Sequence, residues 1–131
     1  MAPKFRVDAS AYLGLCLGLL TLPLPWLFGA ILAAAVHEFC HYLVARTMGV
    51  HCQCVRVGIR GMKMRFPALT RKEEWLIAAA GPLGSMALLI FLRKFPQLAV
   101  SGLVQGLFNL LPVYPMDGGR ILRCICRNSD S

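Results

Sequence analysis

The chain has 131 residues, of which 57% are hydrophobic and 15% charged, with a formal net charge of +8 at pH 7 and a mean hydropathy of +0.62. Soluble domains are about 45–50% apolar and about 25% charged, so this composition excludes a disordered chain and argues against an ordinary cytosolic globule. A basic charge carried by so few residues is typical of a membrane protein whose cations lie in its loops, and we expect no nucleic-acid partner.

The first apolar run is uninterrupted by charge from Asp8 to Glu38. It is longer than the about 20 residues of one membrane span, and Pro23 and Pro25 cannot both continue one helix. We therefore predict a short helix over 9–22 and a second helix over 26–46. A cleaved signal peptide is the alternative for the first segment, but the sequence after it lacks a small-residue cleavage pattern.

A basic connection follows over 46–74. Within it, the segment 55–66 alternates apolar residues with Arg, Lys or Gly, which predicts a short β-hairpin turning near Arg60 and Gly61. Two more apolar segments follow, over 75–92 and 97–111. The first is rich in small residues that let membrane helices approach closely. The second predicts a helix that breaks at Pro112 and Pro115 and resumes through Ile121.

These segments predict an all-α multi-pass membrane protein with about four transmembrane helices, a short β-hairpin-like cytosolic connection and a fourth helix broken by Pro and Gly. Residues 1–131 form a single domain. With four crossings, twelve Lys and Arg residues lie on one side of the membrane and two on the other, Arg93 and Lys94. The positive-inside rule then places both termini and the connection in the cytosol.

The second predicted helix contains His37-Glu38-Phe39-Cys40-His41, which has the pattern His-Glu-x-x-His. Residues four apart lie on one face of a helix, so both imidazoles can bind one zinc ion while Glu38 handles the proton of a water molecule. Ionisable residues inside a membrane helix are costly and usually functional. The alternative is a polar cluster satisfied by neighbouring helices, or a proton path.

Two histidines do not complete a catalytic zinc site, which uses three protein ligands and an open position. Asp117 is the favoured third ligand, because it lies where prolines and glycines break a membrane helix, and such irregular backbone is tolerated only inside protein or beside a cavity. The alternatives are Glu73, Glu74, His51 and Asp130. For Asp117 itself, the competing role is a salt bridge to Arg120.

Together, these motifs resemble those of the site-2 proteases, a family of intramembrane zinc metalloproteases. The resemblance rests on His37-Glu38-x-x-His41 and on Asn109-x-x-Pro112-x-x-Pro115-x-Asp117-Gly118-Gly119. Ala80-Gly81-Pro82 also matches a small-residue element of the family. The chain looks similar to the membrane core of the bacterial sporulation branch, which cleaves a membrane-tethered sigma-factor precursor. Ser85 departs from the pattern, because relatives often have Asn there.

The resemblance implies one Zn²⁺ held by His37, His41 and Asp117, with Glu38 as the catalytic acid and base. Asn109 is implied to hold the substrate backbone or to stabilise the oxyanion. The expected reaction is hydrolysis of a peptide bond in a membrane-spanning or membrane-tethered protein near the cytosolic side of the bacterial cell membrane. The alternative is a catalytically inactive zinc-binding membrane module that sequesters such a substrate.

The expected partners are the lipid bilayer and a membrane protein substrate, for which the sigma-factor precursor is the candidate. Many family members carry regulatory domains or additional helices, for which this sequence has no room. We therefore also expect either a regulatory membrane partner or a homo-oligomer. A transporter is disfavoured, because the first and third apolar segments contain no acids or histidines near their centres.

Overall fold

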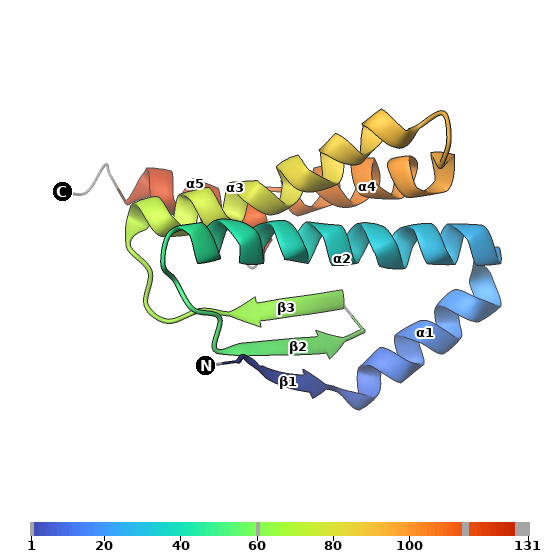
Figure 1. Cartoon of the computed structure of the whole chain (residues 1–131), viewed down its shortest axis with the longest axis horizontal. Coiled ribbons are helices and arrows are strands. Elements are labelled where there is room, and N and C mark those ends of the chain that lie inside the picture. The colour runs from blue at the N-terminus through green and yellow to red at the C-terminus, as the bar shows by residue number, and fades with distance from the viewer. Residues whose placement is uncertain (1, 60, 114–115, 128–131) are drawn as a thin grey trace.

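The computed structural model describes residues 2–59, 61–113 and 116–127. This part of the chain is mostly helical and includes a small three-stranded sheet (Figure 1). The elements, in chain order, are β1 (Lys4–Val7), α1 (Ala9–Thr21), α2 (Leu24–Thr47), β2 (Cys54–Gly58), β3 (Gly61–Arg65), α3 (Arg71–Ala87), the 3-10 helix η1 (Leu88–Phe91), α4 (Pro96–Asn109) and α5 (Asp117–Cys126).

The prolines divide the first apolar run as predicted. Pro23 precedes the first residue of α2, and Pro25 occupies the first turn of that helix, where a missing N–H costs no intrahelical hydrogen bond. The 24 residues of α2 rise about 36 Å at 1.5 Å per residue, enough to cross a hydrocarbon core of about 30 Å. The 13 residues of α1 rise only about 20 Å.

The third helix begins earlier than predicted, at Arg71 rather than at residue 75. Thr70 is the reason, because it forms a reciprocal capping box with Glu73: the Thr70 backbone N–H donates to Glu73 Oε2 at 2.8 Å, and the Glu73 N–H donates to Thr70 Oγ1. Such a box satisfies two otherwise unpaired groups at a helix start. Farther along the chain, the predicted break is present, since α4 ends at Asn109 and α5 begins at Asp117. Pro115 lies outside the described residues.

The predicted hairpin is confirmed: β2 and β3 pair in antiparallel register. Arg60, one of the two residues at which the turn was predicted, lies outside the described residues. The other, Gly61, has a φ of +96°, a conformation that glycine adopts without steric cost.

The prediction of an all-α fold with only a hairpin was incomplete, because β1 adds a third strand in parallel to β2. A four-residue strand with no buried residue carries too little periodicity to be recognised. Its partner lies about 50 residues away in the sequence, so no local pattern indicates the pairing.

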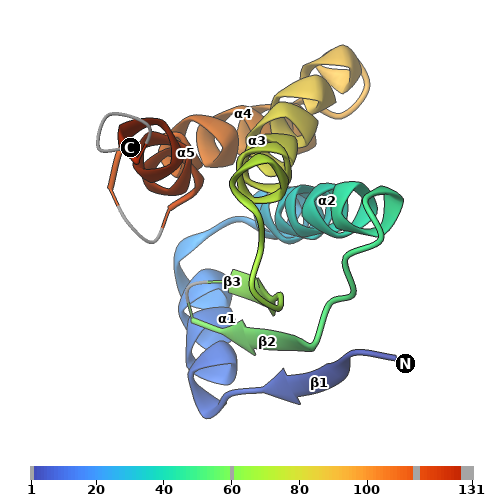
Figure 2. The ribbon, with the colours of Figure 1, turned by 90° about the vertical axis from the view of Figure 1, so that its left-hand side faces the viewer.

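Helix α2 lies between two layers (Figures 1 and 2). The sheet runs along one side of its C-terminal half, with β3 nearest to it, and α3 and α4 cover the other side. The connection predicted to be cytosolic therefore folds back along α2 instead of projecting beyond its end. Between the helices, Ala33, Ala78 and Ala99 are fully buried, because small side chains allow the helix backbones to approach closely.

Two helical stretches of the described chain are long and apolar enough to cross a membrane, α2 and the continuous stretch Arg71–Phe91. Helix α1 is apolar but shorter, and α4 has 14 residues. The predicted four crossings and the cytosolic placement of the termini therefore stay predictions.

Candidate metal centre

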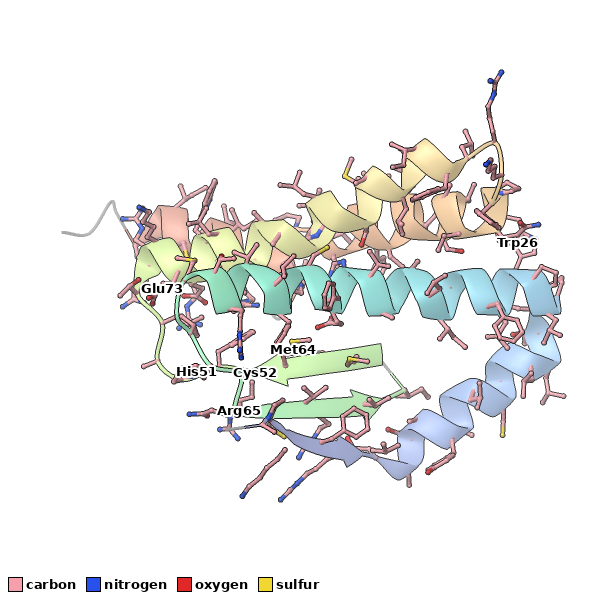
Figure 3. The ribbon with its side chains drawn as sticks, viewed as in Figure 1. Trp26, His51, Cys52, Met64, Arg65 and Glu73 are labelled. Atoms are coloured by element: carbon pink, nitrogen blue, oxygen red, sulfur yellow. The ribbon has the colours of Figure 1, made fainter. Side chains whose placement is uncertain are left out.

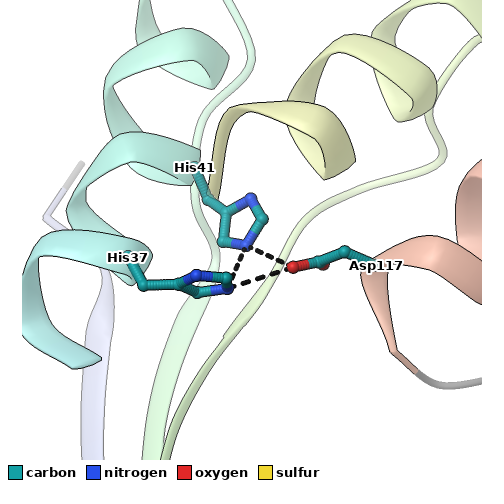
Figure 4. A group of neighbouring side chains, drawn as sticks. All are labelled: His37, His41 and Asp117. Carbon is teal, nitrogen blue, oxygen red and sulfur yellow. Dashed lines mark hydrogen bonds and ion pairs between the residues drawn. The ribbon is translucent and has the colours of Figure 1, made fainter. Parts of the chain in front are cut away.

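Three buried side chains converge between α2 and the first turn of α5 (Figure 4). His37 and His41 lie four residues apart on α2, and Asp117 is the first residue of α5. Asp117 Oδ2 lies 3.0 Å from His37 Nε2 and 3.2 Å from His41 Nε2, and the two Nε2 atoms are 3.2 Å apart. The structure thus brings together the two histidines of the sequence motif and the favoured third ligand.

The outer nitrogen of each ring is held by α3. His41 Nδ1 donates to the Ile77 backbone carbonyl at 2.6 Å, and His37 Nδ1 is hydrogen-bonded to Ser85 Oγ at 2.7 Å. A carbonyl can only accept, so Nδ1 of His41 carries the proton and Nε2 of the neutral ring presents a lone pair. This arrangement, with Nδ1 anchored and Nε2 free, is typical of metal-binding histidines.

The inner atoms therefore form an electron-rich group that suits a cation. When His41 is neutral, its Nε2 and the Asp117 carboxylate are both hydrogen-bond acceptors. The only proton that can lie among the three inner atoms is then one on His37 Nε2. Two imidazole nitrogens and one carboxylate oxygen are a common protein ligand set of catalytic zinc sites. The residues present thus fit Zn²⁺, and the three ligand atoms lie within 4.8 Å of one another.

Asp117 engages two different partners through its two oxygens. Oδ2 faces the histidines, whereas Oδ1 lies 3.8 Å from Arg120 Nη1. Arg120 in turn lies 3.8 Å from Glu74 Oε1. The salt bridge to Arg120 and the role as a metal ligand were predicted as alternatives for Asp117, but the carboxylate has one oxygen for each. Arg120 contacts Oδ1 and so orients Oδ2 towards the histidines.

Gly81 closes the site from α3. A Cβ at this position would overlap the His41 ring and would lie 2.8 Å from His37 Nε2. Because any larger residue would displace the imidazoles, glycine is required for α3 to pass this close to the histidine pair. The small-residue motif around Gly81, noted in the sequence, thus allows the site to form.

Glu38 is half-buried and lines a cavity of about 1060 Å³, into which both histidines and Asp117 also face. Asn109 lines the same cavity from the end of α4, where its Nδ2 donates to the Gln105 carbonyl at 2.9 Å. On the far side, the cavity is bordered by strand β3. The three favoured metal ligands, Glu38 and Asn109 therefore line one cavity beside α2.

The other candidate third ligands have different surroundings. Glu73 belongs to the capping box at the start of α3, and Glu74 pairs with Arg120. His51 is exposed in the connection before β2. Among the described residues, the metal-type cluster contains His37, His41 and Asp117 without these three. Asp130 lies outside the described residues.

The roles of Ile77, Ser85 and Arg120 were not predicted from the sequence. A signal for the first two was available, since Ile77, Gly81 and Ser85 recur at intervals of four residues and therefore share one helical face. Both flanking residues are fully buried. For Arg120, the salt bridge to Asp117 was considered, but only as an alternative to metal binding and not as a support for it.

The chain is similar in sequence to proteins named zinc metalloproteases. No family model matches the chain. A protein named zinc metalloprotease Rip3 from Mycobacterium tuberculosis is 34% identical over 81% of this chain and 34% of its own length. The zinc metalloprotease MJ0392 from Methanocaldococcus jannaschii is 32% identical over 71% of this chain and 32% of its own length.

The solved site-2 protease from Methanocaldococcus jannaschii matches 98% of this chain and 70% of its own length, with a TM-score of 0.76 and 26% identity. The chain belongs to the site-2 protease family. It spans about a third of the length of the curated zinc metalloproteases that it matches. The predicted family is thereby confirmed, and zinc is the metal that both the relatives named zinc metalloproteases and the donor set indicate.

In this chain, Ser85→Ala is expected to weaken zinc binding about 10–100-fold, the usual cost of removing a hydrogen-bond partner of a metal ligand. The hydroxyl holds the His37 ring through Nδ1, and alanine leaves that nitrogen without its partner. Zinc affinity is measured by competition with a chromophoric chelator. Ser101→Ala on α4 is the matched control and should bind zinc normally; equal affinities for both variants would contradict the role of Ser85.

Proposed function

We propose that this chain is the catalytic core of an intramembrane zinc metalloendopeptidase. Its reaction is hydrolysis of a peptide bond in a membrane-spanning or membrane-tethered protein, near the cytosolic side of the membrane. The observation that carries this proposal is the convergence of His37, His41 and Asp117 at 3.0–3.2 Å, with Glu38 facing the same cavity.

In this reaction, His37 and His41 through Nε2, and Asp117 through Oδ2, would hold the zinc ion. The bound ion supplies Lewis acidity and lowers the pKa of water towards about 7. Glu38 accepts a proton from the attacking water and returns it to the leaving amine nitrogen. Ser85, the Ile77 carbonyl and Arg120 keep the three ligands oriented while Glu38 remains free to exchange protons.

Asn109 is the proposed donor to the substrate. Its side-chain amide donates one N–H to the Gln105 carbonyl, and the second N–H of the same nitrogen is available for another hydrogen bond. From the end of α4, this group can hold the substrate backbone or the developing oxyanion. Its position on the rim of the cavity supports this role.

The outer edge of β3 is the proposed seat of the unwound substrate. In the order β1-β2-β3, one edge of β3 has no neighbouring strand among the described residues, and residues from Gly61 to Arg65 border the cavity. An extended peptide can pair with such an edge through backbone hydrogen bonds. This pairing would keep a helical substrate unwound, so that a carbonyl can reach the site.

The proposal also includes the setting of the reaction. Twelve of 14 Lys and Arg residues lie on one side of a four-crossing topology, which supports cytosolic termini and a site near the cytosolic face. A membrane-tethered sigma-factor precursor, processed during sporulation, is the proposed substrate. We also propose that a regulatory membrane partner or a second copy associates with this core.

A catalytically inactive zinc-binding module that sequesters the substrate is the second candidate. The cluster of three ligands alone supports this candidate as well as it supports the peptidase. Glu38 distinguishes the two, because a purely structural zinc site has no need of a carboxylate beside its ligands in an open cavity.

Reversible metal removal tests the proposed function. The purified chain, reconstituted with its membrane partner if one is required, is incubated with a model transmembrane substrate. A zinc chelator is expected to stop cleavage, and added Zn²⁺ to restore it, because the histidine and aspartate ligands are otherwise held by the fold. Cleavage that persists in the zinc-free protein would rule out the metallopeptidase, and zinc binding without any cleavage would favour the sequestering module.

A further inference from the structure

The register of the sheet separates its side chains into two faces of opposite chemistry. Residues directly opposite each other in neighbouring strands point to the same face, and neighbours along a strand point to opposite faces. One face is apolar. Its residues are Phe5, Val7, Val55, Val57, Met62 and Met64.

The other face is cationic. It consists of two rows across the three strands, joined residue by residue in the register. The rows are Lys4-Cys54-Arg65 and Arg6-Arg56-Lys63. Five cations of the described strands therefore share one face of a sheet only three strands wide.

The apolar face is turned towards α2. Figure 3 shows Met64 between β3 and α2, whereas Arg65 lies on the opposite side of the strand. Burial agrees with this orientation, since Val55 is 8% exposed and the side chain of Arg56 is 60% exposed. The cations of this face are exposed, and those of the edge strand β3, Lys63 and Arg65, also border the cavity beside α2.

These cations repel one another. Directly opposite side chains in neighbouring strands lie about 4.5–5.5 Å apart at Cβ, and like charges in such pairs are destabilising. One acidic side chain contacts this face in the described structure: Asp8 Oδ2 lies 3.7 Å from Arg56 Nε. A single carboxylate against five cations leaves a surplus that an external anion would stabilise.

The position of this face identifies the anion. Strand β1 is followed directly by α1, an apolar helix with no buried residue, so the cationic face adjoins a segment suited to lipid. Phe5 and Val7, on the apolar face of the edge strand, are 65% and 46% exposed. Cations on one face and exposed apolar side chains on the other match the two parts of a phospholipid, its phosphate and its acyl chains.

We propose that the cationic face of the sheet, made by Lys4, Arg6, Arg56, Lys63 and Arg65, binds the headgroups of anionic phospholipids in the adjoining leaflet. Basic clusters immediately beside a membrane helix bind anionic lipids, at about 1 kcal/mol for each cation. Three of the five cations are arginines, whose planar groups contact two phosphate oxygens at once. None of the five cations is a zinc ligand, and Lys4, Arg6 and Arg56 lie on the two strands farther from the metal centre, whereas Lys63 and Arg65 also border its cavity. Lipid binding is therefore measured directly and not through peptidase activity.

The test counts lipids bound to the full chain. Delipidated protein in a neutral detergent is titrated with dioleoyl phosphatidylglycerol or with dioleoyl phosphatidylcholine, and bound lipids are counted by native mass spectrometry. The wild type is expected to prefer phosphatidylglycerol. The triple variant R6Q/R56Q/K63Q is expected to bind it about 100-fold more weakly, which is about fivefold for each cation removed. The single variant R6Q, on an exposed strand, should show the fivefold step without any risk to the fold.

Two matched variants isolate the role of the charged row. R6K/R56K/K63R keeps its three charges and is expected to stay within about fivefold of the wild type, whereas K72Q/R93Q/K94Q removes three cations elsewhere and should bind normally. Zinc content and the unfolding temperature verify that each variant is folded. An equal loss in K72Q/R93Q/K94Q, or no preference for phosphatidylglycerol, would overturn the proposal. Displacement of the lipid by a hexaglutamate peptide at lower concentrations would assign the face to an acidic protein segment instead.

Discussion

Glu38→Gln is expected to lower the rate of substrate cleavage by about 10²–10⁴-fold while the protein keeps its zinc. General acid-base catalysis contributes an acceleration of this size, and glutamine has nearly the same shape as glutamate but cannot exchange a proton. The ligand atoms of His37, His41 and Asp117 contact one another without Glu38, so metal content should not change. The measurements are zinc per chain by atomic spectroscopy and cleavage of a model transmembrane substrate.

Glu73→Gln is the matched control, because it removes a carboxylate of the same length at the start of α3. Glutamine also forms a capping box, so the Thr70 contact is preserved and cleavage should be close to that of the wild type. If Glu38→Gln cleaved as fast as this control, Glu38 would not be the acid and base. If it lost its zinc, Glu38 would belong to the ligands.

Asp117→Ala is expected to weaken zinc binding by more than about 100-fold, which exceeds the upper end of the loss caused by removing an outer-shell partner. It removes the carboxylate, which is the anionic member of the cluster, and leaves two imidazoles. Cleavage should be lost together with the metal, in contrast to Glu38→Gln. The measurement is zinc affinity by chelator competition, with circular dichroism to verify that the helices are retained.

Asp8→Ala provides the comparison for Asp117. This acid also forms an ion pair, to Arg56 at 3.7 Å, but it lies at the start of α1 and not among the three metal-binding candidates. Normal zinc affinity in Asp8→Ala and its loss in Asp117→Ala would assign the third ligand. Full zinc binding by Asp117→Ala would show that another group completes the site.

The sequence predicted the site better than it predicted the fold around it. His37 and His41 are four residues apart on a helix, so their convergence follows from local geometry. Asp117 is 80 residues from His37; it was favoured because irregular backbone at membrane depth indicates a cavity or a protein interior, and the family resemblance implied it as well. The structure brings the three residues together, and a contact between residues so far apart in the sequence cannot be predicted from local periodicity.

The remaining features depended on tertiary contacts. Strand β1 forms because β2 offers it a parallel partner, and the hydrogen-bond partners of His37 and His41 come from α3, 48 and 36 residues away. Ser85 illustrates the difficulty. In the sequence it was a departure from the expected Asn, whereas in the structure its hydroxyl contacts His37. Its function depends on which helix passes α2 at that point.

The placement of the ligands along the chain has a consequence for biosynthesis. A ribosome releases His37 and His41 early, but Asp117 emerges only after α3 and α4 have been made. Until then, a nascent chain holds an incomplete ligand set and cannot bind zinc tightly. For the proposed peptidase, cleavage is therefore expected to begin only after α3 and α4 have been synthesised, because both precede Asp117 in the chain.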